Sequence, residues 1–188
     1  YSPIGKEWNE QTAAFCEYVT GKTAAEVADI ALTETTAPAD ADLSASVSIA
    51  IGDFMALIEK LATIKSVEKA EVKTGYAFTT TLSTENATEE VDGTATTDIS
   101  LIAVTVTEEG VIESCAIDAI QGKVAFDAKG QITTELGEVL SKNELGENYG
   151  MKAFSPIGKE WNEQAAHIAE YAVGKTVEEL KTTAIDEA

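Results

Sequence analysis

The chain has 188 residues, a length that suits one domain or one domain with an appendage. Hydrophobic residues make up 44% of it, enough for a packed core, which excludes a wholly disordered chain. The 33 acidic and 13 basic residues give a formal net charge of -20, and such a surface repels nucleic acid and anionic lipid. No apolar run approaches the roughly 18 residues of a membrane helix. We therefore expect no nucleic-acid partner and no membrane insertion.

The first predicted element is a pair of helices. We expect Ser2 to cap a helix whose first position is Pro3, and Gly21 to end it in a left-handed conformation. A capping-box sequence that starts at Thr23 then predicts a second helix. Apolar side chains at helical spacing indicate the face that anchors the core, and they are Ile4, Trp8, Phe15 and Val19.

The middle of the chain predicts strands and one further helix. Residues 43–51 alternate between apolar and small polar side chains, which indicates a half-buried strand, and Gly52-Asp53 then begins a short helix over 54–62. Three segments rich in Thr and Val are predicted as strands, over residues 71–82, 94–107 and 111–120. Residues 108–110, Glu-Glu-Gly, indicate a hairpin between the last two strands.

Two segments with weaker signals follow the strands. Residues 121–141 hold either another strand or a turn-rich excursion, and residues 142–150 are predicted as a loop rich in Gly and Asn. Strands that are followed by helices, without strict alternation, favour an α+β fold. We expect an antiparallel sheet covered on one face by amphipathic helices.

The ten residues from Ser2 to Gln11 occur again, unchanged, from Ser155 to Gln164. When residues 1–35 are laid over residues 154–188, 19 of the 35 positions are identical. The offset of 153 residues is far longer than the roughly 20–50 residues of a solenoid repeat. The repeating object is therefore a whole domain.

This period predicts the domain organisation. Residues 1–65 comprise the helix pair, a strand and a helix, and they read as the end of one repeat period. Residues 66–188 comprise the strand-rich region and the second copy of the helix pair. The chain begins inside a motif, so we expect it to be a processed product or an excerpt of a longer tandem-domain protein.

Catalytic and metal-binding patterns are weak throughout. His167 is the single histidine, Ala14 takes its place in the first copy, and one histidine is too few for a zinc site. Cys16 is replaced by Ala169 in the second copy, so we interpret Cys16 and Cys115 as small buried side chains, with a disulfide as the alternative. Paired aspartates lack the ligand spacing of a specific calcium loop, and they are Asp40 with Asp42 and Asp92 with Asp98. We predict a protein that is not an enzyme and that has no metal site.

One stretch resembles a known family. The sequence Asp-Gly-Thr-Ala-Thr at 92–96, with the strands over 101–106 and 111–120, resembles the opening of the FMN-binding-type domains in secreted lipoproteins of Gram-positive anaerobes. Residues 142–152 and 155–176 resemble repeats in secreted proteins of such organisms. The resemblance covers about half of the period, and it implies an extracellular or cell-surface location.

The same resemblance implies FMN as the one candidate cofactor. In flavinylated members a Thr of the motif carries the flavin, and Ala95 stands at that position here. The hydroxyls left as cofactor-binding candidates are those of Thr94, Thr96 and Thr97. Without the flavin, we expect no cofactor.

The duplicated helix pair favours a structural function. One complete fold needs the strand-rich region and one helix pair, so the other pair is free to dock where a neighbour's equivalent belongs. We expect an acidic, extracellular repeat protein whose partners are copies of itself, assembled head-to-tail into an array or filament. The predicted interface residues are Ile157, Trp161, Ile168, Tyr171 and Leu180. The alternatives are a fragment of a tandem array, an FMN or small-ligand module in electron transfer, and a hydrolase of glycan material.

Overall fold

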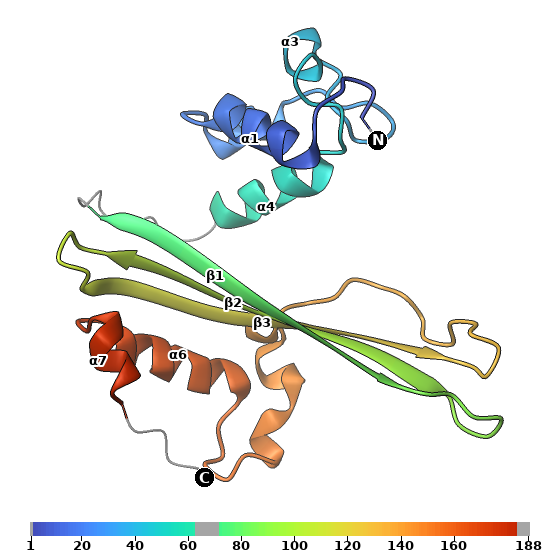
Figure 1. Cartoon of the computed structure of the whole chain (residues 1–188), viewed down its shortest axis with the longest axis vertical. Helices are drawn as coiled ribbons and strands as arrows, with labels where there is room; N and C mark the ends of the chain where they lie inside the picture. Colours follow the sequence, from blue (N-terminus) through green and yellow to red (C-terminus); the bar gives the residue numbers. More distant parts are fainter. Residues whose placement is uncertain (1, 63–71, 184–188) are drawn as a thin grey trace. The chain divides into compact units, whose positions relative to one another are not determined.

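A computed structural model describes residues 2–62 and 72–183 of the chain (Figure 1). The chain divides into two compact units, Tyr1–Lys69 and Ala70–Ala188, named here the N-terminal and the C-terminal unit. The predicted boundary between residues 65 and 66 lies outside the described residues. Helices and a three-stranded antiparallel sheet make up the described structure, so the α+β prediction is confirmed.

The N-terminal unit is helical. Its helices are α1 (Trp8–Val19), α2 (Ala24–Ala28), α3 (Ala41–Ser44) and α4 (Gly52–Ala62). Apolar side chains from these helices and from the segment between α3 and α4 form one core, composed of Phe15, Val27, Leu43, Val47, Ile51 and Met55. The capping box at Thr23 is confirmed, since its hydroxyl accepts a hydrogen bond from the N–H of Glu26. The predicted helix over 54–62 is confirmed as part of α4.

The prediction that the first helix starts at Pro3 is wrong. Gly5 has a φ of +67°, which a right-handed helix does not allow, and its N–H donates to the carbonyl oxygen of Ser2 in a turn. The helix begins only at Trp8, so Ile4 lies outside it. Trp8 was also expected in the core, but its side chain is 62% exposed.

The predicted strand over residues 43–51 is also wrong. The carboxylate of Asp40 accepts hydrogen bonds from the N–H groups of Asp42 and Leu43, and this cap starts α3 instead. Leu43, Val47 and Ile51 all lie in the core. Only Leu43 lies in α3; Val47 and Ile51 follow in turns and irregular backbone, so the alternation reported burial but not a strand.

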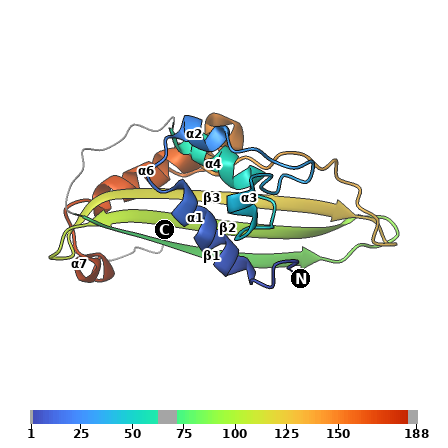
Figure 2. The same cartoon turned by 90° about the horizontal axis from the view of Figure 1, so that it is seen from above.

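The C-terminal unit is built on the sheet. Its strands are β1 (Lys73–Glu85), β2 (Gly93–Val106) and β3 (Ile112–Phe126), paired antiparallel in the order β1-β2-β3 (Figure 2). The predicted hairpin is confirmed, with Gly110 at a φ of +82°. Residue 71 of the first predicted strand lies outside the described residues. Residues 121–126 continue β3 rather than forming another strand.

The loop predicted over residues 142–150 is wrong in part. Residues Lys142–Leu145 form the short helix α5, and two 3-10 helices follow it, η1 (Gly146–Tyr149) and η2 (Met151–Ala153). The hydroxyl of Ser141 accepts a hydrogen bond from the N–H of Glu144 and so caps α5. This turn carries the chain from the sheet back toward the second copy of the repeated motif.

Helix α6 (Trp161–Ala172) packs against β3, and α7 (Val177–Lys181) follows it (Figure 1). The side of α6 that packs consists of buried alanines, Ala165, Ala169 and Ala172. On β3, Ala119 is buried while the neighbouring Ile120, which points to the other face of the sheet, is exposed. Backbone hydrogen bonds hold the end of α6 to β3, from Gly174 N–H to Ile112 O and from Ile112 N–H to Lys175 O.

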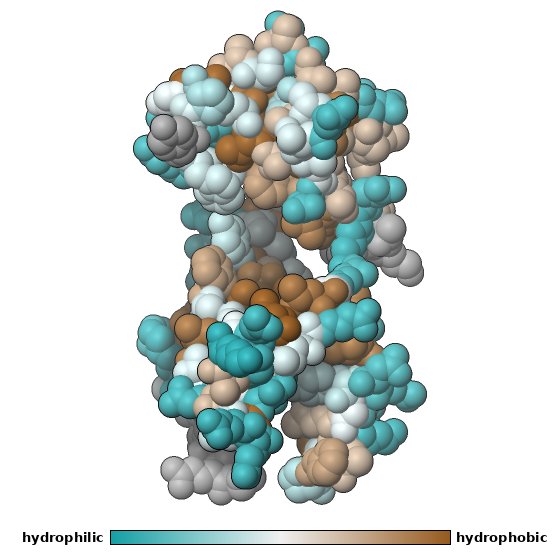
Figure 3. All heavy atoms as spheres, turned by 90° about the vertical axis from the view of Figure 1, so that its right-hand side faces the viewer, coloured by the Kyte–Doolittle hydropathy of each residue, from teal (hydrophilic) through white to brown (hydrophobic). Residues whose placement is uncertain are grey.

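The other face of the sheet is apolar and exposed within the C-terminal unit. Tyr76, Phe78 and Leu82 alternate along β1, and the register places Leu101 of β2 beside Phe78. Figure 3 shows hydrophobic residues at the surface of this unit. Within the described part of the C-terminal unit, helix α6 thus covers one face of the sheet, as the sequence predicts.

Candidate functional site

The two copies of the repeated motif have the same local structure. Helices α1 and α6 each have 12 residues and begin at the Trp of the motif. In both copies the Gln amide nitrogen donates to the Ser hydroxyl and to the Lys carbonyl of its own motif. The glycines that follow the Ile have φ values of +67° and +63°. Any difference between the copies therefore comes from what surrounds them.

In the first copy, Gln11 is fully satisfied and buried, with 1% of its side chain exposed. Its Nε2 donates to the Ser2 hydroxyl at 3.1 Å and to the Lys6 carbonyl at 2.9 Å. Its Oε1 accepts from the N–H of Ser48 at 2.7 Å and from the Ser48 hydroxyl at 3.1 Å. Gln11 thus joins the motif to the segment that carries α3 and α4.

In the second copy, Gln164 lacks that second connection. Its Nε2 repeats the two bonds within the motif and lies 3.9 Å from the sulfur of Met151. Among the described residues, none donates a hydrogen bond to its Oε1. One turn further along, Ile168 is 59% exposed, whereas its counterpart Phe15 is 3% exposed. This face of α6 is open where the same face of α1 is covered.

The motif glutamates show the opposite difference. Glu160 is 4% exposed, and its carboxylate accepts hydrogen bonds from the N–H groups of Met151 at 2.9 Å and Lys152 at 3.0 Å. Its counterpart Glu7 is exposed. The second copy is thus joined to the segment before it, and the first copy to the segment after it.

The residues of α6 that pack on the sheet are also more exposed at the equivalent positions of α1. Ala165, Ala169 and Ala172 correspond to Thr12, Cys16 and Val19 of α1, and none of these three is buried.

The prediction that Cys16 is a buried small side chain is therefore wrong, since Cys16 is exposed. Cys115 is half-buried, and burial raises the pKa of its thiol. Both cysteines are free in the structure.

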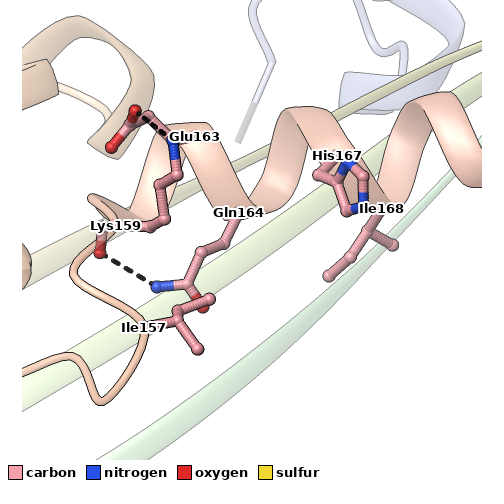
Figure 4. A pocket seen from close by; sticks show the side chains of 6 residues that line it. All are labelled: Ile157, Lys159, Glu163, Gln164, His167 and Ile168. Carbon is pink, nitrogen blue, oxygen red and sulfur yellow. Dashed lines mark hydrogen bonds and ion pairs between the residues drawn. The ribbon is translucent and has the colours of Figure 1, made fainter.

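An open groove of about 460 Å³ lies along the uncovered face of α6 (Figure 4). The side chains that line it are Ile157, Lys159, Glu163, Gln164, His167 and Ile168. At one end, the Lys159 ammonium lies 3.2 Å from the Glu163 carboxylate. The backbone N–H of Glu160 and then the Lys159 ammonium bond this carboxylate and lower the pKa of Glu163. Ile157 and Ile168 add apolar surface beside the polar side chains of the groove, a mixture that suits an interface.

The structure places the five predicted interface residues in different surroundings. Ile157 and Ile168 meet at the groove. Trp161 is half-buried, with the Lys142 ammonium 5.3 Å from its ring centre. The exposed Tyr171 ring lies beneath the Lys175 ammonium, and Leu180 lies on α7. The polar residues that sequence reasoning missed are Gln164 and Glu160, and the signal for both was their identity in the two copies.

The threonines suggested for a flavin do not form one cluster. Thr94, Thr96 and Thr97 lie in β2, where alternation puts Thr94 and Thr96 on one face and Thr97 on the other. The Thr94 hydroxyl donates to the Glu85 carboxylate at 3.4 Å. Within the part of the chain that the structure describes, no group of three or more His, Cys, Asp or Glu side chains has the arrangement of a metal site.

A search for helices that are long and apolar enough to cross a membrane finds none in residues 2–62 and 72–183. Comparison with known proteins adds no family, since no family model, no curated protein and no solved structure matches the chain.

Proposed function

We propose that the chain is a non-enzymatic structural repeat that associates head-to-tail with copies of itself into an extracellular array or filament. The observation that carries the proposal is the complementary state of the two motifs. Gln11 has its partner in the following segment, and Glu160 has its partner in the preceding segment. Each copy of the motif therefore makes one of these two connections, the first through Gln11 and the second through Glu160.

These two halves define one complete domain. It contains the sheet with its connecting segment, one helix pair, and a segment equivalent to residues 36–62. The described residues contain one sheet and one such segment but two helix pairs. Association lets the sheet and helix pair of one copy take the segment of the next, through contacts that the N-terminal unit already makes.

The composition of the surface suits this function. The groove along the open face of α6 exposes two large apolar side chains, Ile168 of the helix and Ile157 of the turn before it. Apolar residues that gather in a groove mark interaction sites more often than single exposed ones do. The net charge of -20 makes copies repel one another, so salt strengthens the association by screening.

Sedimentation velocity and electron microscopy of the full chain, over a range of protein and salt concentrations, test the proposal. We expect species larger than the monomer, in amounts that increase with the protein concentration and with the salt concentration. The variant Ile168→Asp places a charge on the open face of α6 and should abolish them, whereas Leu136→Asp, an exposed residue outside the groove, should not. A chain that stays monomeric under all these conditions contradicts the proposal.

A further inference from the structure

We propose that the open face of α6 is the docking site for a second copy of residues 36–62. In this arrangement α3 and α4 of that copy lie on α6 as they lie on α1 within the N-terminal unit. The inference rests on the proposed function and names the partner segment of its interface. The chain itself contains the same site on α1, where residues 36–62 already cover it.

The N-terminal unit shows what the occupant does. Phe15 of α1 lies in a core with four apolar side chains of residues 36–62, which are Leu43, Val47, Ile51 and Met55. The ring of Phe54 in α4 lies 5.8 Å from the ring of Phe15 and 6.3 Å from that of Trp8. Helix α1 has the same backbone conformation as α6, and its Phe15 face is thus covered by aliphatic and aromatic side chains.

The open face of α6 keeps the groups that this occupant needs. Gln164 presents its Oε1 without a described donor, and it is the counterpart of the atom that accepts two hydrogen bonds from Ser48. Ile168 replaces Phe15 and is smaller, so it enters the same apolar pocket without overlap. Burying a side chain of this size stabilises an interface through the area removed from water.

One substitution adds a polar contact. Ala14 lines a shallow groove beside Asp42, and His167 takes the place of Ala14 in α6. In the docked arrangement, the imidazole of His167 therefore lies next to the Asp42 carboxylate of the second copy. Glu170, the counterpart of Glu17 in that groove, adds a second carboxylate near the imidazole. A histidine between carboxylates suits an interface between two acidic chains.

The other way of exchanging the helix pair is replacement of α6 by α1 on the sheet. It puts Thr12, Cys16 and Val19 where Ala165, Ala169 and Ala172 are buried against β3. All three are larger than alanine, and close-packed interfaces do not accept added atoms without strain. Docking onto α6 is therefore favoured over its replacement.

When a second chain supplies this segment, the exchange costs free energy. That chain gives up the bonds between Gln11 and Ser48 and gains the same bonds between Gln164 and Ser48. Phe15 leaves the core and the smaller Ile168 enters it, so less apolar surface is buried. We therefore expect weak, reversible association that is seen only at high protein concentration.

The test extends the full chain by a second stretch of residues 36–62 after residue 188. This order continues the repeat, so the connection from α6 to the added segment has the same length as that from α1 to α3. We expect hydrogen exchange of the amides in residues 164–172 to slow by about tenfold or more, the factor expected for one large aliphatic side chain. We also expect self-association to be lost, because the site is filled within each chain.

Two variants of the extended chain serve as matched controls. Val47→Asp with Ile51→Asp, made only in the added segment, places two charges where both side chains are fully buried and should abolish the slowing. Ile168→Phe restores the side chain of the first copy and should increase it.

The outcomes separate the two proposals. If the added segment leaves exchange unchanged while the original chain still associates, the docking inference is wrong and the association uses another surface. If the added segment slows exchange while the original chain stays monomeric, the docking inference is right and the proposed function is wrong.

Discussion

Replacing Gln11 and Gln164 by Ala, one at a time, tests whether the two motifs are bonded as described. Gln11 makes four hydrogen bonds from a buried amide, two of them to Ser48 across 37 positions of the chain. Gln164 makes two within its motif and one long contact to sulfur, and it is half-buried. The same substitution therefore removes different amounts of bonding.

The magnitudes follow from these bonds. Each neutral hydrogen bond contributes about 0.5–1.5 kcal/mol net, and a buried donor left unpaired costs about 1–3 kcal/mol. For Gln11→Ala we expect a loss of about 3 kcal/mol, since Ser48 loses the acceptor for its N–H. For Gln164→Ala we expect less than about 1 kcal/mol, because water replaces the lost bonds at a half-exposed site.

Denaturant unfolding followed by tryptophan fluorescence measures both losses. Trp8 and Trp161 are the two tryptophans of the chain, one in each unit. In a Trp161→Phe background the signal reports the N-terminal unit, and in a Trp8→Phe background it reports the C-terminal unit. Equal losses for Gln11→Ala and Gln164→Ala would refute the view that only the first copy is joined to the following segment.

Four further predictions concern the rest of the chain. Glu160→Ala removes a buried acceptor that two backbone N–H groups share and should destabilise the C-terminal unit by about 2 kcal/mol, whereas Glu7→Ala should cost less than about 0.5 kcal/mol. Equal effects in chemical denaturation contradict this. Gly93→Ala puts a Cβ 2.5 Å from a backbone nitrogen and 2.6 Å from a carbonyl oxygen, so thermal unfolding should show a loss of stability of about 1–3 kcal/mol. Gly122→Ala, whose Cβ meets nothing within 4 Å, should be close to neutral. The folded pKa of Glu163 lies below its ordinary value of 4.5, so its carboxylate stabilises the fold above that pH, and this contribution is lost as pH falls through the folded pKa. The difference in unfolding free energy between the original chain and Glu163→Gln should therefore shrink in an acid titration. A difference that grows in acid would show the sign to be wrong. The purified protein should be colourless, and stoichiometric flavin absorbance would instead favour the electron-transfer module.

Local sequence was sufficient for several elements. The capping boxes at Thr23 and Thr176 start α2 and α7, because the groups that form them lie within four residues. The strands and the hairpin at Gly110 followed from alternation and turn chemistry, which are also local. The α+β class followed from the order of these elements.

Local sequence was misleading where two patterns coincided. Residues 43–51 fit a strand by alternation, but only Leu43 lies in a regular element, α3, while Val47 and Ile51 reach the core from turns and irregular backbone. Pro3 suits a helix start, but the left-handed Gly5 prevents one. In both places the decisive information was a contact or a dihedral angle rather than composition.

By itself, the sequence determined that a domain-sized unit repeats, and that the motif of Ser2 to Gln11 adopts one local structure twice. Only the tertiary structure decided which side of each helix is covered. Identical residues have the same local bonds in both copies, but burial depends on the chain before and after them. Gln11 has Ser48 as its partner and Gln164 does not, because residues 36–62 follow only the first copy.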